Sequence, residues 1–132
     1  MTYPLPVQVR DARNRTLQLI AGLDDAQMMG PRLDTVNPLR WEIGHTAYFY
    51  EYWILRQHLQ QAPATATVDQ LYDSISIAHD ERWDLPLPSL DDTLAYMRAV
   101  HDRVRRHVEQ DGPDPRRDYL LEYAIYHEDM HT

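Results

Sequence analysis

Two histidines near the end of this 132-residue chain are spaced for metal binding. His127 and His131 stand four residues apart, about one helical turn, so both imidazoles can reach one ion from the same side. The spacing alone is weak, because two unrelated surface histidines fit it equally. Both residues also extend an apolar stripe begun by Leu120 and Ala124, where an unpaired polar ring is costly to bury. We therefore predict that the two histidines face an interior that satisfies them.

His45 is the candidate for a third ligand, because it lies in the most apolar segment of the chain, beside Ile43 and Gly44. A core histidine hydrogen-bonded to Glu42 or Glu51 is the alternative. Three neutral imidazoles from two antiparallel helices would cap one face of a divalent ion and leave positions open for water, dioxygen or substrate. Iron(II), zinc and nickel all suit imidazole, so the ligands leave the metal undecided.

Arg82 is a candidate for substrate binding. It stands beside Trp83 near a predicted loop over the helices, where a guanidinium can bind a carboxylate through two hydrogen bonds. A surface ion pair with Asp80 or Asp84 is the alternative. The aromatic run over 48–53 fits a cage for a quaternary ammonium group, although packing is the simpler explanation.

The remaining histidines show no pattern that indicates a shared site. We expect His58 and His107, in polar surroundings near helix ends, to be solvated. His101 is expected at the edge of the core, and His79 beside an extended segment that precedes residue 89.

The elements that must position these residues are helices, since apolar residues recur every three to four positions. We predict long helices over 7–23, 38–61, 89–111 and 115–132, and a shorter one over 69–82. Asn37, Ser89 and Asp114 are the predicted N-caps. In the first helix Arg13 is expected to turn away from the core. The fold class is all-α, a four-helix bundle with a long middle loop and short helix.

Composition excludes several classes of function. The chain has 43% hydrophobic and 26% charged residues and a net charge of -8, and all 13 basic residues are arginine. No basic stripe is available to bind nucleic acid, and with no cysteine the strong metal ligands are His, Asp and Glu. No leader or membrane-spanning segment is evident, so we expect a cytoplasmic protein that does not bind membranes.

The last predicted helix is shorter than the second. We therefore expect part of the central helix to lack a neighbour, and residues 1–132 to form the N-terminal domain of a longer enzyme.

Two segments resemble the metal-ligand motifs of DinB-like domains in ergothioneine-type sulfoxide synthases. Residues 37–46, with Glu51, resemble the first ligand helix, and 127–131 resemble the second motif. Residues 71–74, 78–83 and 85–89 resemble the middle of that domain, especially in the selenoneine synthase branch. The resemblance covers nearly the whole chain.

The resemblance implies a DinB-like bundle that binds iron(II) through His45, His127 and His131. In that family the bundle is fused to a C-terminal domain like the formylglycine-generating enzyme, which this sequence lacks. Such enzymes use dioxygen to join sulfur or selenium, from a thiol or selenosugar donor, to hercynine. Met130 stands where ergothioneine synthases often have Gln, which favours the selenoneine-like branch.

Two other functions fit the same residues. A thiol-dependent DinB-like transferase or hydrolase would use zinc or nickel to activate a thiolate. A non-catalytic interaction domain would need no metal.

Overall fold

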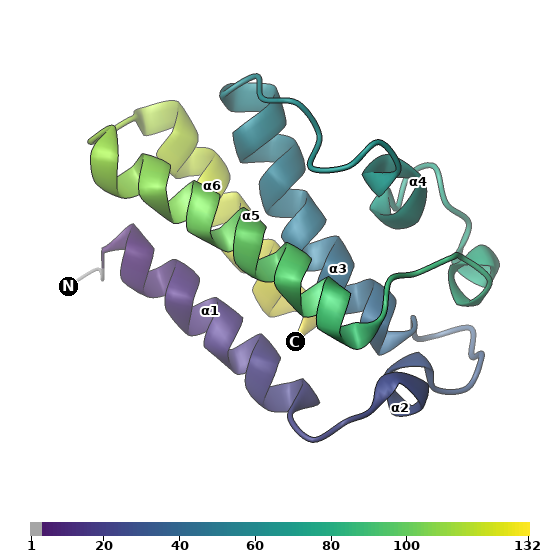
Figure 1. Cartoon of the computed structure of the whole chain (residues 1–132). Coiled ribbons are helices and arrows are strands. Elements are labelled where there is room, and N and C mark those ends of the chain that lie inside the picture. Colours follow the sequence, from purple (N-terminus) through teal and green to yellow (C-terminus); the bar gives the residue numbers. More distant parts are fainter. Residues whose placement is uncertain (1–3) are drawn as a thin grey trace.

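The structure is a computed structural model that describes residues 4–132. In that range it is all-α and contains no strand, which confirms the predicted fold class (Figure 1). The elements are, in order, α1 (Leu5–Ile20), α2 (Asp25–Met29), α3 (Leu39–Tyr50), the π-helix η1 (Glu51–His58), α4 (Val68–Tyr72), the 3-10 helix η2 (His79–Trp83), α5 (Leu90–Gln110) and α6 (Pro115–His131).

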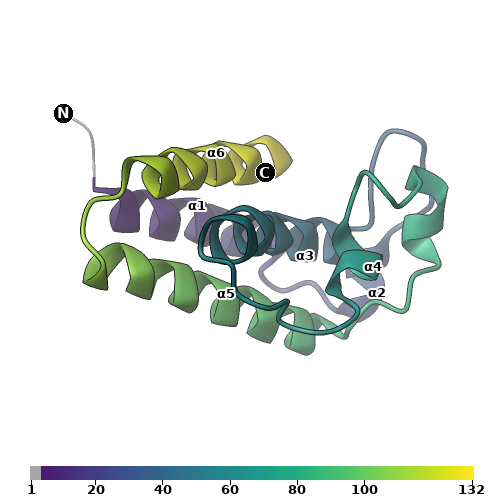
Figure 2. The ribbon, with the colours of Figure 1, turned by 90° about the horizontal axis from the view of Figure 1, so that it is seen from above.

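Four long rods form the bundle: α1, α3 with its continuation η1, α5, and α6. Helices α1 and α6 run in one direction, whereas α3 and α5 run in the opposite direction (Figures 1 and 2). The parallel pair α3 and α5 needs a long connection back along the bundle, and residues 59–89 supply it with α4 and η2. Helices α3 and α6 are therefore antiparallel neighbours.

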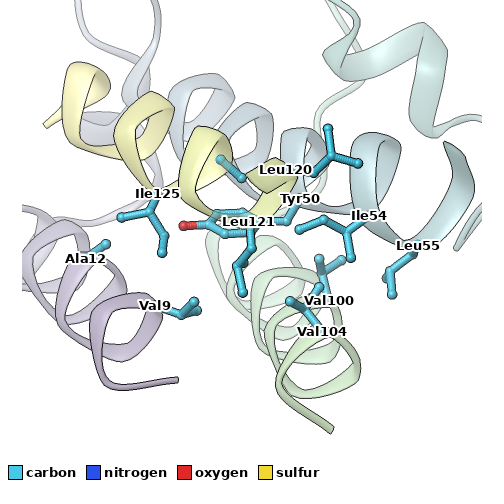
Figure 3. Packing of buried hydrophobic residues seen from close by; sticks show 11 residues of the cluster. Val9, Ala12, Tyr50, Ile54, Leu55, Val100, Val104, Leu120, Leu121 and Ile125 are labelled. Carbon is cyan, nitrogen blue, oxygen red and sulfur yellow. The ribbon is translucent and has the colours of Figure 1, made fainter. Parts of the chain in front are cut away.

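The main hydrophobic core lies between the four rods (Figure 3). Helix α1 contributes Val9 and Ala12, and α5 contributes Val100 and Val104. The other buried members come from α3, η1 and α6: Tyr50, Ile54, Leu55, Leu120, Leu121, Ala124 and Ile125. Removing this apolar surface from water is the main stabilising contribution to a bundle.

A buried polar network crosses the core and corrects the prediction for Arg13. Its guanidinium is buried rather than turned outward, and Nε donates to Oε2 of Glu128 at 3.1 Å. Thr16 donates to the same oxygen at 2.7 Å, and Tyr50 donates to Oε1 at 2.8 Å. Glu128 is fully buried. The network thus joins α1 and α3 to α6.

Several predicted helix bounds were wrong because local capping ends the helices. The first helix stops at Ile20, since Gly22 takes a φ of 83° and Asp24 caps the separate α2. Pro38, not Asn37, occupies the N-cap position of α3. The side chains of Ser89 and Asp114 do cap α5 and α6 as predicted.

The single short helix predicted over 69–82 is instead two elements, α4 and η2, separated by a turn. The Asp73 carboxylate accepts hydrogen bonds from the Ile75 N–H at 3.0 Å and the Ser76 hydroxyl at 2.8 Å. This side chain competes with the helical pattern and ends α4.

Helix α6 runs beside α3 and η1 from Glu42 to His58. Near one end His58 donates to Asp114 at 2.8 Å, and near the other His131 contacts Glu42. Helix α6 has 17 residues and is shorter than α3 and η1 together, which have 12 and 8, as expected. Residues near both ends of the rod formed by α3 and η1 nevertheless contact α6 or its N-cap. Over 4–132, the helices are all too short or too polar to cross a membrane.

Candidate metal centre

The structure brings His45, His127 and His131 together at one end of the bundle. Helix α3 supplies His45, and α6 supplies the other two. One ring nitrogen from each residue lies within 4.8 Å of the other two. The ring centroid of His45 is 5.0 Å from that of His127 and 5.1 Å from that of His131. The three imidazoles therefore converge on one point.

The antiparallel packing of α3 and α6 explains the convergence. His127 and His131 lie one turn apart on the face of α6 that meets α3, and their Nε2 atoms are 3.2 Å apart. Two nitrogens that each bind one ion at about 2.0–2.1 Å lie about 3 Å apart. The spacing fits shared ligation of a single ion.

His45 is held by α4. Its Nδ1 donates to the Tyr72 carbonyl at 2.8 Å, and Trp41 Nε1 donates to the Leu71 carbonyl at 2.7 Å. The close approach of Tyr72 requires Gly44, because a Cβ there would overlap the Tyr72 ring. With Nδ1 engaged, Nε2 of His45 is the nitrogen left to bind an ion.

His131 is oriented by a carboxylate. Its Nδ1 donates to Glu42, whose other oxygen accepts a hydrogen bond from Asn37 at 2.7 Å. Burial alone would raise the pKa of Glu42, but the hydrogen bonds from His131 and Asn37 outweigh it and lower that pKa. Glu42 is thus an ionised acceptor, the usual partner of a metal-binding imidazole.

His127 has a different environment. Its ring stacks on Phe49 with centroids 3.7 Å apart and planes 10° apart. Its Nδ1 is buried with no hydrogen-bond partner among the described residues. The ring is therefore positioned by packing rather than by a hydrogen bond at Nδ1.

Two of the three imidazoles are neutral at pH 7. Burial lowers the pKa of His45 to about 4 and that of His127 to about 3. A neutral imidazole is the form that binds a metal ion. The convergent nitrogens, the neutral rings and the flanking acceptors fit a divalent cation.

The structure also corrects the alternative offered for His45. Neither Glu42 nor Glu51 bonds to it: Glu42 binds His131, and Glu51 accepts from Tyr96 at 2.6 Å. Sequence reasoning missed the Tyr72 carbonyl as the partner of His45 and assigned Glu42 to His45 rather than to His131. The position of Glu42, one helical turn before His45, indicated a carboxylate close to the histidines. A backbone carbonyl such as that of Tyr72 leaves no such indication in the sequence.

Arg82 lies close to the histidines but does not form the surface ion pair considered above. It donates to Asn37 Oδ1 at 2.9 Å and to the Ile77 carbonyl at 3.1 Å, while Asp84 pairs with Arg32. Its guanidinium also lies 4.1 Å from the ring of Trp41, which stacks on His45. Asn37 thus links Arg82 to Glu42 and the histidine cluster.

The other histidines lie outside the cluster. His58 and His107 are partly buried and paired rather than simply solvated, His58 with Asp114 and His107 with Asp111 at 2.8 Å each. His101 is partly buried, as predicted, and burial lowers its pKa to about 4. His79 accompanies Trp83 and bonds to the Leu33 carbonyl.

Comparison with known proteins gives a family match. The model of the DinB superfamily matches residues 8–132. Hercynine oxygenase of Mycolicibacterium smegmatis is 30% identical over 125 residues, and that of Mycolicibacterium thermoresistibile is 29% identical over 126. These alignments cover 91% and 94% of this chain but 28% of each relative. Hercynine oxygenase of Mycobacterium tuberculosis is 28% identical over 138 residues, with 99% of this chain and 31% of the relative covered.

Proposed function

Because the chain belongs to the DinB superfamily, we propose that it is the metal-binding part of an enzyme that oxidises hercynine with dioxygen. In this proposal His45, His127 and His131 bind one iron(II) ion. The observation that carries it is the convergence of three imidazole nitrogens within 4.8 Å of one another. Similarity to hercynine oxygenases supports the choice of substrate and of an oxygenase reaction.

The metal would supply activation of dioxygen next to the bound imidazole substrate. The chain supplies a face of three imidazole nitrogens and orients two of the rings from behind, His45 through the Tyr72 carbonyl and His131 through Glu42. Three protein ligands leave coordination positions open for substrates. The protein's contribution is then to orient those substrates at the open face.

The sulfur or selenium donor would bind on the same open side. We propose that Arg82 binds a substrate carboxylate there, as a planar guanidinium can. Two of its nitrogens donate to Asn37, Ser74 and Ile77, whereas its Nε is buried with no hydrogen-bond partner among the described residues. Product formation with a thiol and with a selenosugar donor would identify the chalcogen.

The chain spans about 28% of the length of the two Mycolicibacterium relatives. We therefore propose that residues 1–132 act as one metal-binding domain and that turnover also needs a further domain that completes the substrate pocket. This part of the proposal is tested by adding that domain, in cis or in trans, to an otherwise inactive chain.

The ligand assignment is tested by metal content after purification under argon. We expect about one iron per chain, and at least about a tenfold loss of affinity in His45→Ala, His127→Ala or His131→Ala. His58→Ala and His107→Ala are the matched controls, since these histidines lie outside the cluster. Wild-type affinity in His45→Ala would reject the three-histidine site. Bound zinc with thiol-dependent, oxygen-independent turnover would favour the transferase alternative instead.

A further inference from the structure

A cavity of about 330 Å³ opens beside His45, between α3 with η1, α6 and the turn after α4. Its volume is within the range of pockets that hold small ligands. Five aromatic side chains line it: Tyr48, Phe49, Tyr52, Trp53 and Tyr123. The aromatic run of the sequence therefore does more than fill the core, because its rings border a space.

The rings form a continuous wall. Trp53 meets Tyr52 edge to face at 5.1 Å, and Phe49 meets Tyr123 in the same way at 5.1 Å. Trp53 and Tyr123, from η1 and α6, are 6.3 Å apart. Because each ring is braced by another, the wall is preorganised rather than assembled by the ligand.

The charge of the cavity is negative. Asp73 lines it, and its carboxylate is held in place by hydrogen bonds from Ile75 and Ser76. No arginine is among the described residues that line it. Arg56 lies 5.5 Å from the centroid of the Tyr52 ring, and its charge is paired with Asp69.

Aromatic faces together with a carboxylate select a cation that carries apolar substituents. A primary ammonium group would need several hydrogen-bond acceptors, and an uncharged apolar group would gain nothing from Asp73. A quaternary ammonium group needs no acceptor and gains from both the rings and the carboxylate.

We propose that this cavity binds the quaternary ammonium group of a betaine substrate. The inference rests on the proposed function and deepens it, because hercynine is the trimethylammonium betaine of histidine. His45 lines the cavity and belongs to the histidine cluster, so the two sites adjoin. A short molecule can therefore place its ammonium group in the cavity and its imidazole near the metal ligands.

The test uses choline as the probe and dimethylbutanol, in which carbon replaces the charged nitrogen, as its uncharged isostere. Binding to the metal-free chain is followed by NMR at the Trp53 indole and at Ile75, which is almost fully exposed beside the cavity. We expect millimolar choline to shift both signals and dimethylbutanol to bind at least about fivefold more weakly. Equal binding of the two probes, or no shift with choline, would overturn the proposal.

Variants locate the site. Trp53→Leu, Tyr123→Leu and Asp73→Asn should each weaken choline binding at least about threefold. Tyr119→Leu, an exposed tyrosine one turn earlier on α6 that does not line the cavity, is the matched control. Tyr123 is itself 49% exposed, so its replacement tests binding with little risk to folding. Equal effects of Tyr119→Leu and Tyr123→Leu would contradict the assignment.

The choline experiment needs no metal, dioxygen or chalcogen donor, so its failure differs from failure of the proposed function. Choline binding without oxidation of hercynine by the metal-loaded, completed enzyme would reject the oxygenase and retain the ammonium site. Oxidation of hercynine with the same KM in wild type and in Tyr123→Leu would reject the ammonium site and retain the oxygenase.

Discussion

Each imidazole of the cluster is fixed by a different kind of contact. A backbone carbonyl orients His45, a carboxylate orients His131, and a stacked ring orients His127. The first two contacts leave Nε2 available and strengthen its basicity, as partners behind metal ligands generally do. The third fixes position but adds no polarisation.

Glu42→Gln tests the carboxylate. The amide can still accept from His131, but it loses the charge that favours a strongly donating imidazole. We expect iron affinity to fall about tenfold, with the fold retained. Competition with a coloured chelator measures the affinity, and circular dichroism checks the fold.

Glu81→Gln, at an exposed position, is the control for that change and should leave the affinity as it is. An unaltered affinity in Glu42→Gln would mean that the charge behind His131 has no role in binding.

The convergence of the three histidines could be predicted from the sequence because its signal is local: one helical repeat on an apolar stripe and one histidine in an apolar segment. Their role as metal ligands stays a prediction. Their partners could not be predicted. Glu42 lies one turn from His45 but pairs with His131, 89 residues away, because the end of α6 lies beside the start of α3. Such a pairing depends on the packing of two elements.

At the scale of elements, Gly44 lets α4 approach α3. Gly44→Ala would place a methyl group in the Tyr72 ring, and overpacking of this kind typically destabilises by about 1–3 kcal/mol. Because the Tyr72 carbonyl holds His45, we expect lower iron affinity as well. Urea unfolding and metal titration measure the two effects.

Tyr72→Leu added to Gly44→Ala supplies the check, since a smaller side chain relieves the overlap while the backbone carbonyl remains. Recovery of affinity in the double variant is expected. No recovery would place the defect elsewhere in α3.

Glu128 joins the elements α1, α3 and α6 through Arg13, Thr16 and Tyr50. Glu128→Gln leaves the buried guanidinium without its counter-charge, so we expect a loss of about 3 kcal/mol in the free energy of unfolding. Equilibrium urea unfolding measures it.

Glu122→Gln, at an exposed position of the same helix, should change stability by less than about 0.5 kcal/mol. Similar losses in the two variants would show that the network adds nothing specific.

Helix positions were predictable to within a few residues where a cap and an apolar stripe agree, as at Ser89 and Asp114. Helix bounds were not predictable where a side chain competes with the helical hydrogen bonds, as Asp73 does. Burial was not predictable for charged residues that are buried as a pair. Taken singly, Arg13 and Glu128 are residue types that belong at the surface. Both are buried here because each neutralises the charge of the other.

At the scale of the whole molecule, partly or fully buried neutral histidines make stability depend on pH. The ordinary histidine pKa is 6.5, and burial lowers it to about 4 in His45 and His101 and to about 3 in His127. Below pH 6.5 the unfolded chain binds more protons than the folded one. Stability of the metal-free chain should therefore be fully present above pH 6.5 and fall between pH 6.5 and about 3.

His101→Gln isolates one contribution, because His101 lies outside the metal cluster and glutamine does not titrate. The urea midpoint, measured at intervals from pH 7.5 to 4, should fall less steeply in this variant. The exposed Gln57→His, which adds a histidine with no burial, should keep the wild-type slope. A slope in His101→Gln equal to that of wild type would assign the acid sensitivity to other groups.

The division of the cluster between α3 and α6 also sets when the site can exist during protein synthesis. Glu42 precedes its partner His131 by 89 residues, and His45 leaves the ribosome with the same helix as Glu42. At about 5–20 residues per second, α3 waits on the order of 5–20 s before α6 follows it. Until then the nascent chain offers one imidazole of the cluster, which cannot hold an ion tightly by itself. In the proposed site, loading with metal would therefore be a late event, after α6 has emerged and docked against α3.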